Sequence, residues 1–318
     1  MTALLALCGL AAAYEVDPWS GRDQPLAPAD MLADAKLNAA LDAAANRVSR
    51  RCPRDPVRMQ DALARAVFHE TGRRSRPEDL PWRRSFGHGV YSGWLEVGPV
   101  DRVDGGTGIG VFTGLGLLES PVLAWAGTAS TVMLGGERVG TDKVDHFLAI
   151  GYRYWRWSRH GGELERAVRR GTTTERLFFG RLTSNAFSYA DLAANLDGYR
   201  FYASLAAASF APDPDGCVMR ADDFQWSGHV DPSWDELANP TAYGPRVARQ
   251  IATNLDDDRE ALCAAFAAIR PAARPEAVAG RAPAVAGPLG LGAFCVDPPQ
   301  AAEATRVRSR ADSHGSGG

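Results

Sequence analysis

The residues best placed to do chemistry lie in two short stretches of the chain. In the first, Asp142, Lys143 and His146 fall within little more than one helical turn. Asp142 and His146 have the i,i+4 spacing that brings two side chains together on one face of a helix. In the second stretch, Ser188 stands three residues before Asp191. Carboxylate, amine, imidazole and hydroxyl are the groups that acid–base, nucleophilic and metal-assisted catalysis use.

Two kinds of catalytic site could be made from these side chains. Asp142, His146 and Asp191 could hold a divalent metal and leave coordination positions open for water. Alternatively, Lys143 or His146 could act as a base toward Ser188. Each residue also has an ordinary structural explanation, with Asp142 as a helix cap, His146 as a half-exposed helix residue and Ser188 as an N-cap. The sequence leaves both interpretations open.

The first stretch is predicted to be a helix over about residues 142–158. At about 100° per residue, its apolar residues form one wide arc that should face the core: Val144, Phe147, Leu148, Gly151, Tyr154 and Trp155. Asp142, His146 and Arg153 fall on the opposite side. Lys143 falls inside the apolar arc, although the chain has only one other lysine, Lys36, among its 35 basic residues.

A lysine that points toward a core needs an anionic partner, because an unpaired buried charge is very costly. A second predicted helix opens at Ser188 and supplies one. Its polar side chains form a single stripe between apolar arcs: Ser188, Asp191, Asn195, Tyr199 and Tyr202. We therefore predict that Lys143 pairs with Asp191, at a separation within about 6 Å. Asn195 and a tyrosine, Tyr199 or Tyr202, are predicted to complete a buried polar network.

The remaining patterns predict a mainly α fold, a single compact helical domain with one or two small β-hairpins. A hairpin is predicted in T131-V-M-L-G-G-E-R-V139, where two glycines separate two strand-like runs. Gly72 is expected to end the second helix of the chain. Helical patterns cover about residues 30–49, 56–71, 163–179, 188–208 and 243–269.

Composition divides the chain into four parts. The content of 45% hydrophobic and 23% charged residues is typical of a globular protein. Residues 1–13 are predicted to be a signal peptide, and residues 14–29 an extended, turn-rich lead-in. Residues 30–270 should form the helical domain. Residues 271–318 are rich in Pro, Ala and Gly and are predicted to be a largely disordered tail.

The beginning of the sequence favours export to the periplasm or cell envelope. An apolar run ends in Ala11-Ala12-Ala13, which fits an A-x-A cleavage site, although no positive charge precedes it. A buried first helix and a lipoprotein cysteine at Cys8 are the alternatives. Four further cysteines could form two disulfides in any of three connectivities, or could remain buried and unpaired: Cys52, Cys217, Cys263 and Cys295.

Three segments resemble a family of uncharacterised exported proteobacterial proteins. They are T141-D-K-V-D-H-F147, F187-S-Y-A-D-L-A-A-N-L-D-G-Y-R-F-Y202 and the D-P-S-W-D-E-L-A-N-P stretch over 231–240. The family pattern reads D-K-x-x-H-F followed by S-Y-A-D-L-x-A-N-x-x-G-x-R-F, and the resemblance covers about residues 85–245. It implies export and a shared polar core. It assigns no activity, so it transfers no catalytic residue to this chain.

The aromatic and basic end of the first helix suggests one kind of partner. Arg153, Trp155, Arg156 and Trp157 could make peripheral contact with a membrane surface, because a basic helix with tryptophans can lie at a lipid interface. The alternative is a packed helix with its arginines in solvent. The net charge of -3 and the predicted export argue against nucleic acid.

The sequence thus predicts an exported cell-envelope protein whose buried Lys/Asp/Asn/Tyr network has a structural or binding role. The alternative is a hydrolase or metal-dependent enzyme that uses the same cluster. Geometry separates the two, because a catalytic site needs a cavity that reaches solvent and a structural network does not.

Overall fold

The helix that carries the second motif, α10 (Tyr189–Ala208), runs through the middle of the structure. The computed structural model describes residues 15–75, 91–106, 108–120, 123–124, 127–158, 163–175, 184–208, 210–212, 217–220, 222–256, 259–267, 269 and 295. The predicted signal peptide and, apart from Cys295, the predicted tail lie outside these residues. From Tyr189 to Tyr199 every residue of α10 is buried, as expected for a helix covered on all sides.

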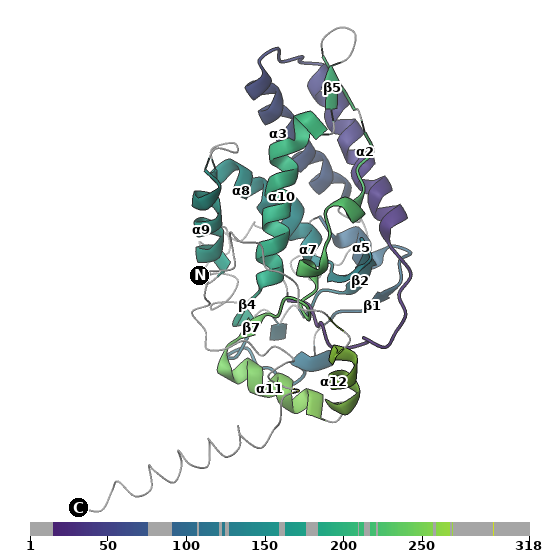
Figure 1. Ribbon diagram of the computed structural model, residues 1–318, viewed down its shortest axis with the longest axis vertical. Coiled ribbons are helices and arrows are strands. Elements are labelled where there is room, and N and C mark those ends of the chain that lie inside the picture. Colours follow the sequence, from purple (N-terminus) through teal and green to yellow (C-terminus); the bar gives the residue numbers. More distant parts are fainter. Residues whose placement is uncertain are drawn as a thin grey trace, which may run out of the picture.

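Other helices surround α10 (Figure 1). The antiparallel pair α2 (Asp30–Ser49) and α3 (Pro56–Ser75) lies on one side. The segment α7 (Asp142–Asp145), η2 (His146–Ile150, a π-helix) and α8 (Gly151–Trp157) packs against it, and α9 (Leu164–Thr174) follows. The short α5 (Gly93–Val97) is linked to α7 through Ser92, the residue before it, which donates a hydrogen bond to Asp145. At the base lie α11 (Pro245–Leu255) and α12 (Arg259–Ala267).

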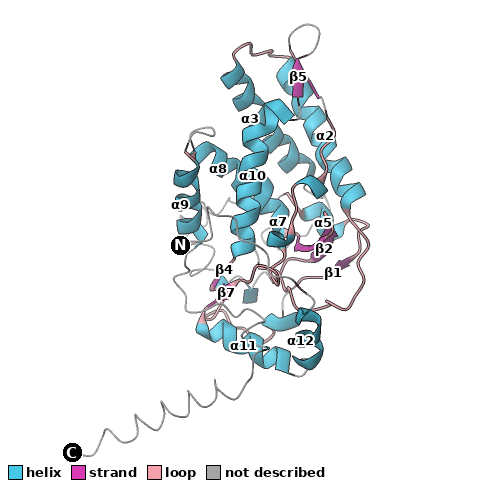
Figure 2. Ribbon diagram, viewed as in Figure 1, coloured by secondary structure: helices cyan, strands magenta, loops and turns pink. Residues whose placement is uncertain are grey.

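The strands are short and antiparallel (Figure 2). One sheet contains β1 (Arg102–Val103), β2 (Thr131–Leu134) and β3 (Glu137–Gly140). The others pair β4 (Ala186–Phe187) with β7 (Ala242–Tyr243), and β5 (Phe210–Pro212) with β6 (Val218–Arg220). The described residues also include the short 3-10 helices η1 (Gly110–Phe112), η4 (Trp226–Gly228) and η5 (Pro232–Trp234). The predicted fold class, mainly α with small hairpins, is confirmed.

The predicted hairpin is confirmed in β2 and β3, with Leu134 opposite Glu137. Its two-residue turn places Gly135 and Gly136 at φ 62° and 85°, the left-handed region that glycine occupies without strain. Two boundaries differ from the prediction. Helix α3 continues past Gly72 to Ser75, and the helix expected over 243–269 is divided into α11 and α12.

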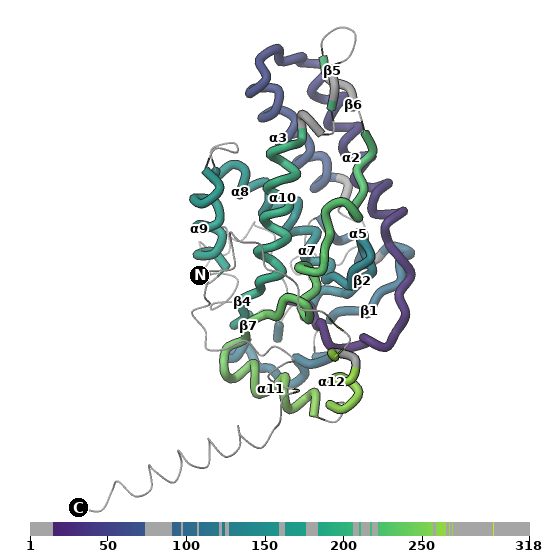
Figure 3. The backbone as a smooth tube through the Cα atoms, in the orientation of Figure 1, coloured from purple at the N-terminus to yellow at the C-terminus, as the bar shows by residue number. Residues whose placement is uncertain are grey.

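The N-terminal segment of residues 15–29 packs along β2. Val16 forms a parallel bridge with Ala129, and Pro28 forms one with Met133. Figure 3 shows this segment as the purple tube that leads into α2. Turns and bends occupy residues 18–24, and Glu15 and Val16 before them are buried, with exposed fractions of 3% and 2%.

Two glycines let α10 approach the helix that carries the first motif. A Cβ added to Gly198 would lie 2.0 Å from the backbone oxygen of Phe147, and one added to Gly151 would lie 2.5 Å from the Cα of Gly198. Contacts this short cannot be accommodated without moving the backbone, so glycine at both positions sets the distance between the two helices.

We expect Gly198→Ala to lower the free energy of unfolding by about 1–3 kcal/mol, the usual effect of forcing an extra methyl group into a packed core. Chemical denaturation measures the change. Gly228→Ala is the control, because a Cβ there would meet no atom within 4 Å. Equal losses in the two variants would show that the helix crossing is not the cause.

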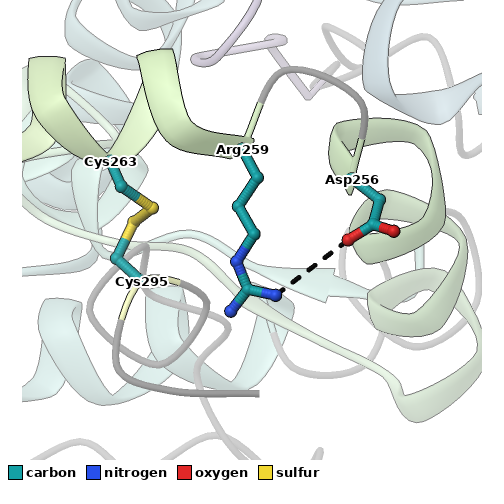
Figure 4. Close-up of a disulfide and its surroundings, with 4 residues drawn as sticks. All are labelled: Asp256, Arg259, Cys263 and Cys295. Atoms are coloured by element: carbon teal, nitrogen blue, oxygen red, sulfur yellow. Dashed lines mark ion pairs between the residues drawn. A yellow bond between two sulfur atoms is a disulfide. The ribbon is translucent and has the colours of Figure 1, made fainter.

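Two disulfides hold distant parts of the chain together. Cys52, after α2, is bonded to Cys217, before β6, across 165 residues of sequence. Cys263 on α12 is bonded to Cys295 across 32 residues, close to the ion pair of Arg259 with Asp256 (Figure 4). Of the pairings left open by the sequence, these are the two observed. Disulfides are typical of an oxidising, exported environment.

The apolar core has two parts. The larger one surrounds α10 and includes Phe147, Phe187 and Trp234. The smaller one lies under α11 and includes Ala186 and Tyr243. No helix in the described part of the chain is both long enough and apolar enough to cross a membrane.

Candidate functional site

Lys143 lies at the centre of a buried ionic cluster. Its Nζ is 2.6 Å from Asp142 Oδ2, 2.7 Å from Asp191 Oδ1 and 2.6 Å from Glu236 Oε1. The exposed fraction of Lys143 is 0%. The predicted pair of Lys143 with Asp191 is therefore confirmed. The sequence did not predict Glu236 as a third carboxylate, or Asp142 as a direct partner.

Helix α10 holds Asp191 in place through its N-terminal cap. The Ser188 Oγ accepts a hydrogen bond of 3.1 Å from the backbone N–H of Asp191, which confirms Ser188 as the N-cap. In a capping box Asp191 would accept from the N–H of Ser188. Here Glu175 accepts that hydrogen bond instead. The Asp191 carboxylate is thereby left to Lys143 and His146.

Glu236 is presented by a tight turn that follows η5. Asp231 begins the turn by accepting a hydrogen bond of 2.7 Å from the N–H of Ser233. Asp235 accepts one of 2.9 Å from the N–H of Leu237 and forms an ion pair with Arg22. Glu236 Oε1 also accepts a hydrogen bond of 3.2 Å from the Ser188 Oγ. Asp231 and Asp235 therefore hold the turn, and Ser188 helps to hold the Glu236 carboxylate within the cluster.

His146 lies inside the cluster, which corrects its expected position on the exposed side of the helix. Its exposed fraction is 1%. Its Nδ1 is 3.0 Å from Asn195 Oδ1, and its Nε2 is 3.1 Å from Asp191 Oδ2. Burial lowers the pKa of His146, although the Asp191 carboxylate opposes this. A neutral imidazole has one N–H, so both contacts need either a second proton or an Asn195 amide turned to donate.

Asp142 is also buried, with an exposed fraction of 2%, rather than on a solvent-facing side. The helical segment of α7, η2 and α8 packs not only against α10 but also against β3 and α3. Its polar face is therefore covered as well as its apolar face. A helical wheel separates the two faces of this segment but does not show that both of them are buried.

Two further glutamates, Glu15 and Glu175, extend the cluster. Both are buried, and Glu15 Oε1 accepts a hydrogen bond of 2.8 Å from the Ser184 Oγ. Burial raises the pKa of Glu15, and the Glu236 and Asp191 carboxylates raise it further. Burial likewise raises the pKa of Glu175. Neither residue was among the candidates chosen from the sequence.

The buried cluster around Lys143 contains more carboxyl groups than cations. Burial raises the pKa of Asp142 and of Glu236, although Lys143 opposes both shifts. Burial also works against the charge of Lys143, but its three carboxylate partners outweigh burial, and the pKa of Lys143 lies well above its ordinary value. The ammonium of Lys143 therefore remains charged.

The remaining predicted network residues have other partners. The Tyr202 hydroxyl donates a hydrogen bond of 3.0 Å to the backbone oxygen of Leu148, so it does not complete the network around Lys143 as expected. Tyr199 is buried in the larger apolar core. Asn195 does join the network, through His146.

One of the four residues of the predicted membrane-contact site, Trp155, is fully buried. Trp155 has an exposed fraction of 0% and lies in the larger apolar core, so it cannot meet a lipid surface in this fold. Arg153 and Trp157 are only half-buried, and Arg156 is exposed. The arrangement is that of a packed helix with arginine directed to solvent, the alternative that the sequence allowed.

A second pair of buried acids anchors α5 to the same helix. Asp145 accepts hydrogen bonds from the Tyr91 N–H, at 2.8 Å, and from the Ser92 hydroxyl. Glu96 accepts from the N–H of Ser130, at 3.1 Å, and from the hydroxyl of Thr141. Burial raises the pKa of Asp145 to about 7, although its hydrogen bonds oppose the shift.

This shift predicts that stability falls as pH rises. Asp145 binds a proton more tightly in the folded than in the unfolded chain, so its contribution is complete below about pH 4 and is lost by about pH 7. We expect Asp145→Asn to reduce the slope of unfolding free energy against pH by up to about 1.4 kcal/mol per pH unit between about pH 5 and pH 7. Denaturant titrations at several pH values measure the slope. An unchanged slope would contradict the assignment.

Asp142, His146 and Asp191 also meet a simple geometric test for metal ligands. Each offers one ligand atom, and these atoms all lie within 4.8 Å of one another. Carboxylate and imidazole are suitable ligands for a divalent metal. The Lys143 ammonium, however, already contacts both carboxylates at 2.6–2.7 Å. A metal would have to bind beside this positive charge.

The cavity that touches the cluster is very small. It is lined by Glu236 and Gly140 among others and has a volume of about 10 Å³, which is space for about one water molecule. Ser188 and Lys143 have exposed fractions of 0%. In the described part of the chain, the cluster is thus sealed rather than open to a substrate.

Comparison with protein-family models, curated protein sequences and solved structures finds no match for this chain.

Proposed function

We propose that this is an exported protein of the periplasm or cell envelope in which the Lys143 network specifies the fold and performs no reaction. By Lys143 network we mean Lys143 with its carboxylate partners Asp142, Asp191 and Glu236, and His146. One observation carries the proposal: a completely buried ammonium joins α7, the start of α10 and the turn after η5. A buried network of ion pairs and hydrogen bonds can define which segments meet in a core without taking part in chemistry.

The location rests on independent support. The two disulfides are typical of an oxidising compartment. The resemblance of the two motifs to an exported family favours the same place. The experiment is fractionation of a Gram-negative host that expresses the full chain. We expect the protein in the periplasmic fraction with all four of these cysteines oxidised, and a cytoplasmic, reduced protein would overturn the location.

The structural role can be tested by lysine acetylation of the folded protein followed by mass spectrometry. The chain supplies its own control, because it has only two lysines and Lys36 is exposed on α2. We expect rapid acetylation of Lys36 and protection of Lys143, with both modified after denaturation. Rapid acetylation of Lys143 in the folded protein would show that the network is open to reagents and would overturn the proposal.

A second candidate function is a metal-dependent hydrolase. It is favoured by the grouping of Asp142, His146 and Asp191, with Ser188 nearby. Under this proposal Zn²⁺ or Mn²⁺ raises the thermal unfolding temperature of the unmodified protein and has no such effect on His146→Gln. An equal response of both proteins would reject these ligands. The structural proposal predicts no specific response.

A further inference from the structure

A cavity of about 220 Å³ lies between the end of α2 and the middle of α3, away from the Lys143 network. Arg47 and Arg51 come from the α2 side, and Arg65 and His69 from α3. On α3, Arg65 and His69 have i,i+4 spacing, which directs both side chains to the same face. Arg47 lies near the end of α2 and Arg51 in the turn that follows it, and both line the same cavity. One acid, Asp61, also lines it.

Small side chains create the hollow. Ala62 and Ala66 lie one turn apart on the face of α3 that also carries the basic residues, and Val48 of α2 lies opposite. Larger residues at these alanine positions would fill the space between the helices. The cavity therefore has an apolar floor and a basic rim.

The rim charges are only partly neutralised within the protein. Arg65 Nη2 is 2.7 Å from Asp61. Arg47 is 3.4 Å from Glu70, a carboxylate that Arg73 holds more closely, at 2.6 Å. For Arg51, no ion pair is found within the described ranges.

The position of Arg51 is fixed by its neighbour. Cys52 has a φ of 40°, which is unusual for a residue other than glycine, and its disulfide to Cys217 holds this turn against β6. The backbone beside Arg51 is thus attached to the fold by a covalent bond, which limits the ordering of this part of the rim when a ligand binds.

We propose that this cavity binds the phosphate group of a small anionic ligand. Three arginines facing one aspartate leave an excess of positive charge that suits a dianion better than a single carboxylate. The guanidinium group matches phosphate oxygens in a two-point geometry. The volume is below the roughly 300–1,000 Å³ of sites for drug-sized ligands, so the bound group is small. A free phosphorylated molecule and a phospholipid headgroup share this chemistry.

Isothermal titration calorimetry of the full chain with pyrophosphate tests the proposed phosphate-binding site. We expect saturable binding that weakens by roughly tenfold or more in the double variant Arg51→Ala/Arg65→Ala, because each lost charged hydrogen bond has an effect of this order. Ala62→Leu, which fills the hollow and leaves every charge in place, should weaken binding as well. Circular dichroism verifies that the variants are folded.

The matched control is Arg169→Ala/Arg170→Ala, which removes two exposed arginines from α9. It should bind pyrophosphate as the unmodified protein does. A parallel titration with phosphatidic acid vesicles distinguishes a free phosphorylated ligand from a lipid headgroup. Binding to vesicles but not to pyrophosphate assigns a lipid headgroup, provided that Arg51→Ala/Arg65→Ala weakens it and the control variant does not. Absence of saturable binding to both probes, or equal weakening in the control variant, would overturn the proposal.

Discussion

Replacing Lys143 by methionine is expected to lower the free energy of unfolding by about 3–5 kcal/mol, the usual cost of removing one partner from a buried ion pair. Methionine occupies a similar volume, so the effect is mainly electrostatic. It leaves the carboxylates of Asp142, Asp191 and Glu236 buried without their cation. They can avoid that state by binding protons, so the loss should be larger at pH 8 than at pH 5. Denaturant unfolding at the two pH values measures both effects.

The control for this prediction is Lys36→Met, which removes the other lysine of the chain. Lys36 is exposed, so its change should stay within about 0.5 kcal/mol. The double variant Lys143→Met/Asp191→Asn should lose less than the sum of its single variants, because the two groups interact directly. Full stability of Lys143→Met at pH 8 would contradict the central role of the ammonium.

Removal of the Cys52–Cys217 disulfide by serine substitutions is expected to cost about 3–5 kcal/mol. The bond closes a loop of 165 residues, and the entropy that a disulfide removes from the unfolded chain increases with loop length. The Cys263–Cys295 bond closes only 32 residues, so its removal should cost roughly 1–2 kcal/mol less.

Equilibrium unfolding of the two serine double variants, without reductant, measures this difference. The measurement also separates loop closure from local packing. A larger loss for Cys263→Ser/Cys295→Ser would show that contacts around α12 outweigh the entropy of the longer loop.

The sequence predicted the central ion pair for a definite physical reason. The chain uses arginine for nearly all its positive charges, and Lys143 lies where a helical wheel requires an apolar residue. Such a lysine needs a buried carboxylate, and the polar stripe of α10 offered Asp191. The main helices and the β2–β3 hairpin were also predictable, because period and turn residues are local properties of a sequence.

The other partners could not be predicted from local pattern. Glu236 lies in a turn, where no period marks which side chain points inward. Glu15 reaches the cluster only because residues 15–29 return along β2. His146 was misplaced because its helix is buried on both faces, and a helical wheel gives relative direction without exposure. In each case the missing information is the long-range packing of segments.

The span of the Lys143 network has a consequence for how the chain folds. Glu236 is 93 residues beyond Lys143, so the ammonium cannot have its full set of partners until the turn after η5 has been synthesised. Contacts between distant segments form slowly, because the intervening loop must close first. Until then Lys143 lacks one of its three carboxylate partners. An N-terminal fragment that stops before residue 231 therefore cannot complete the Lys143 network.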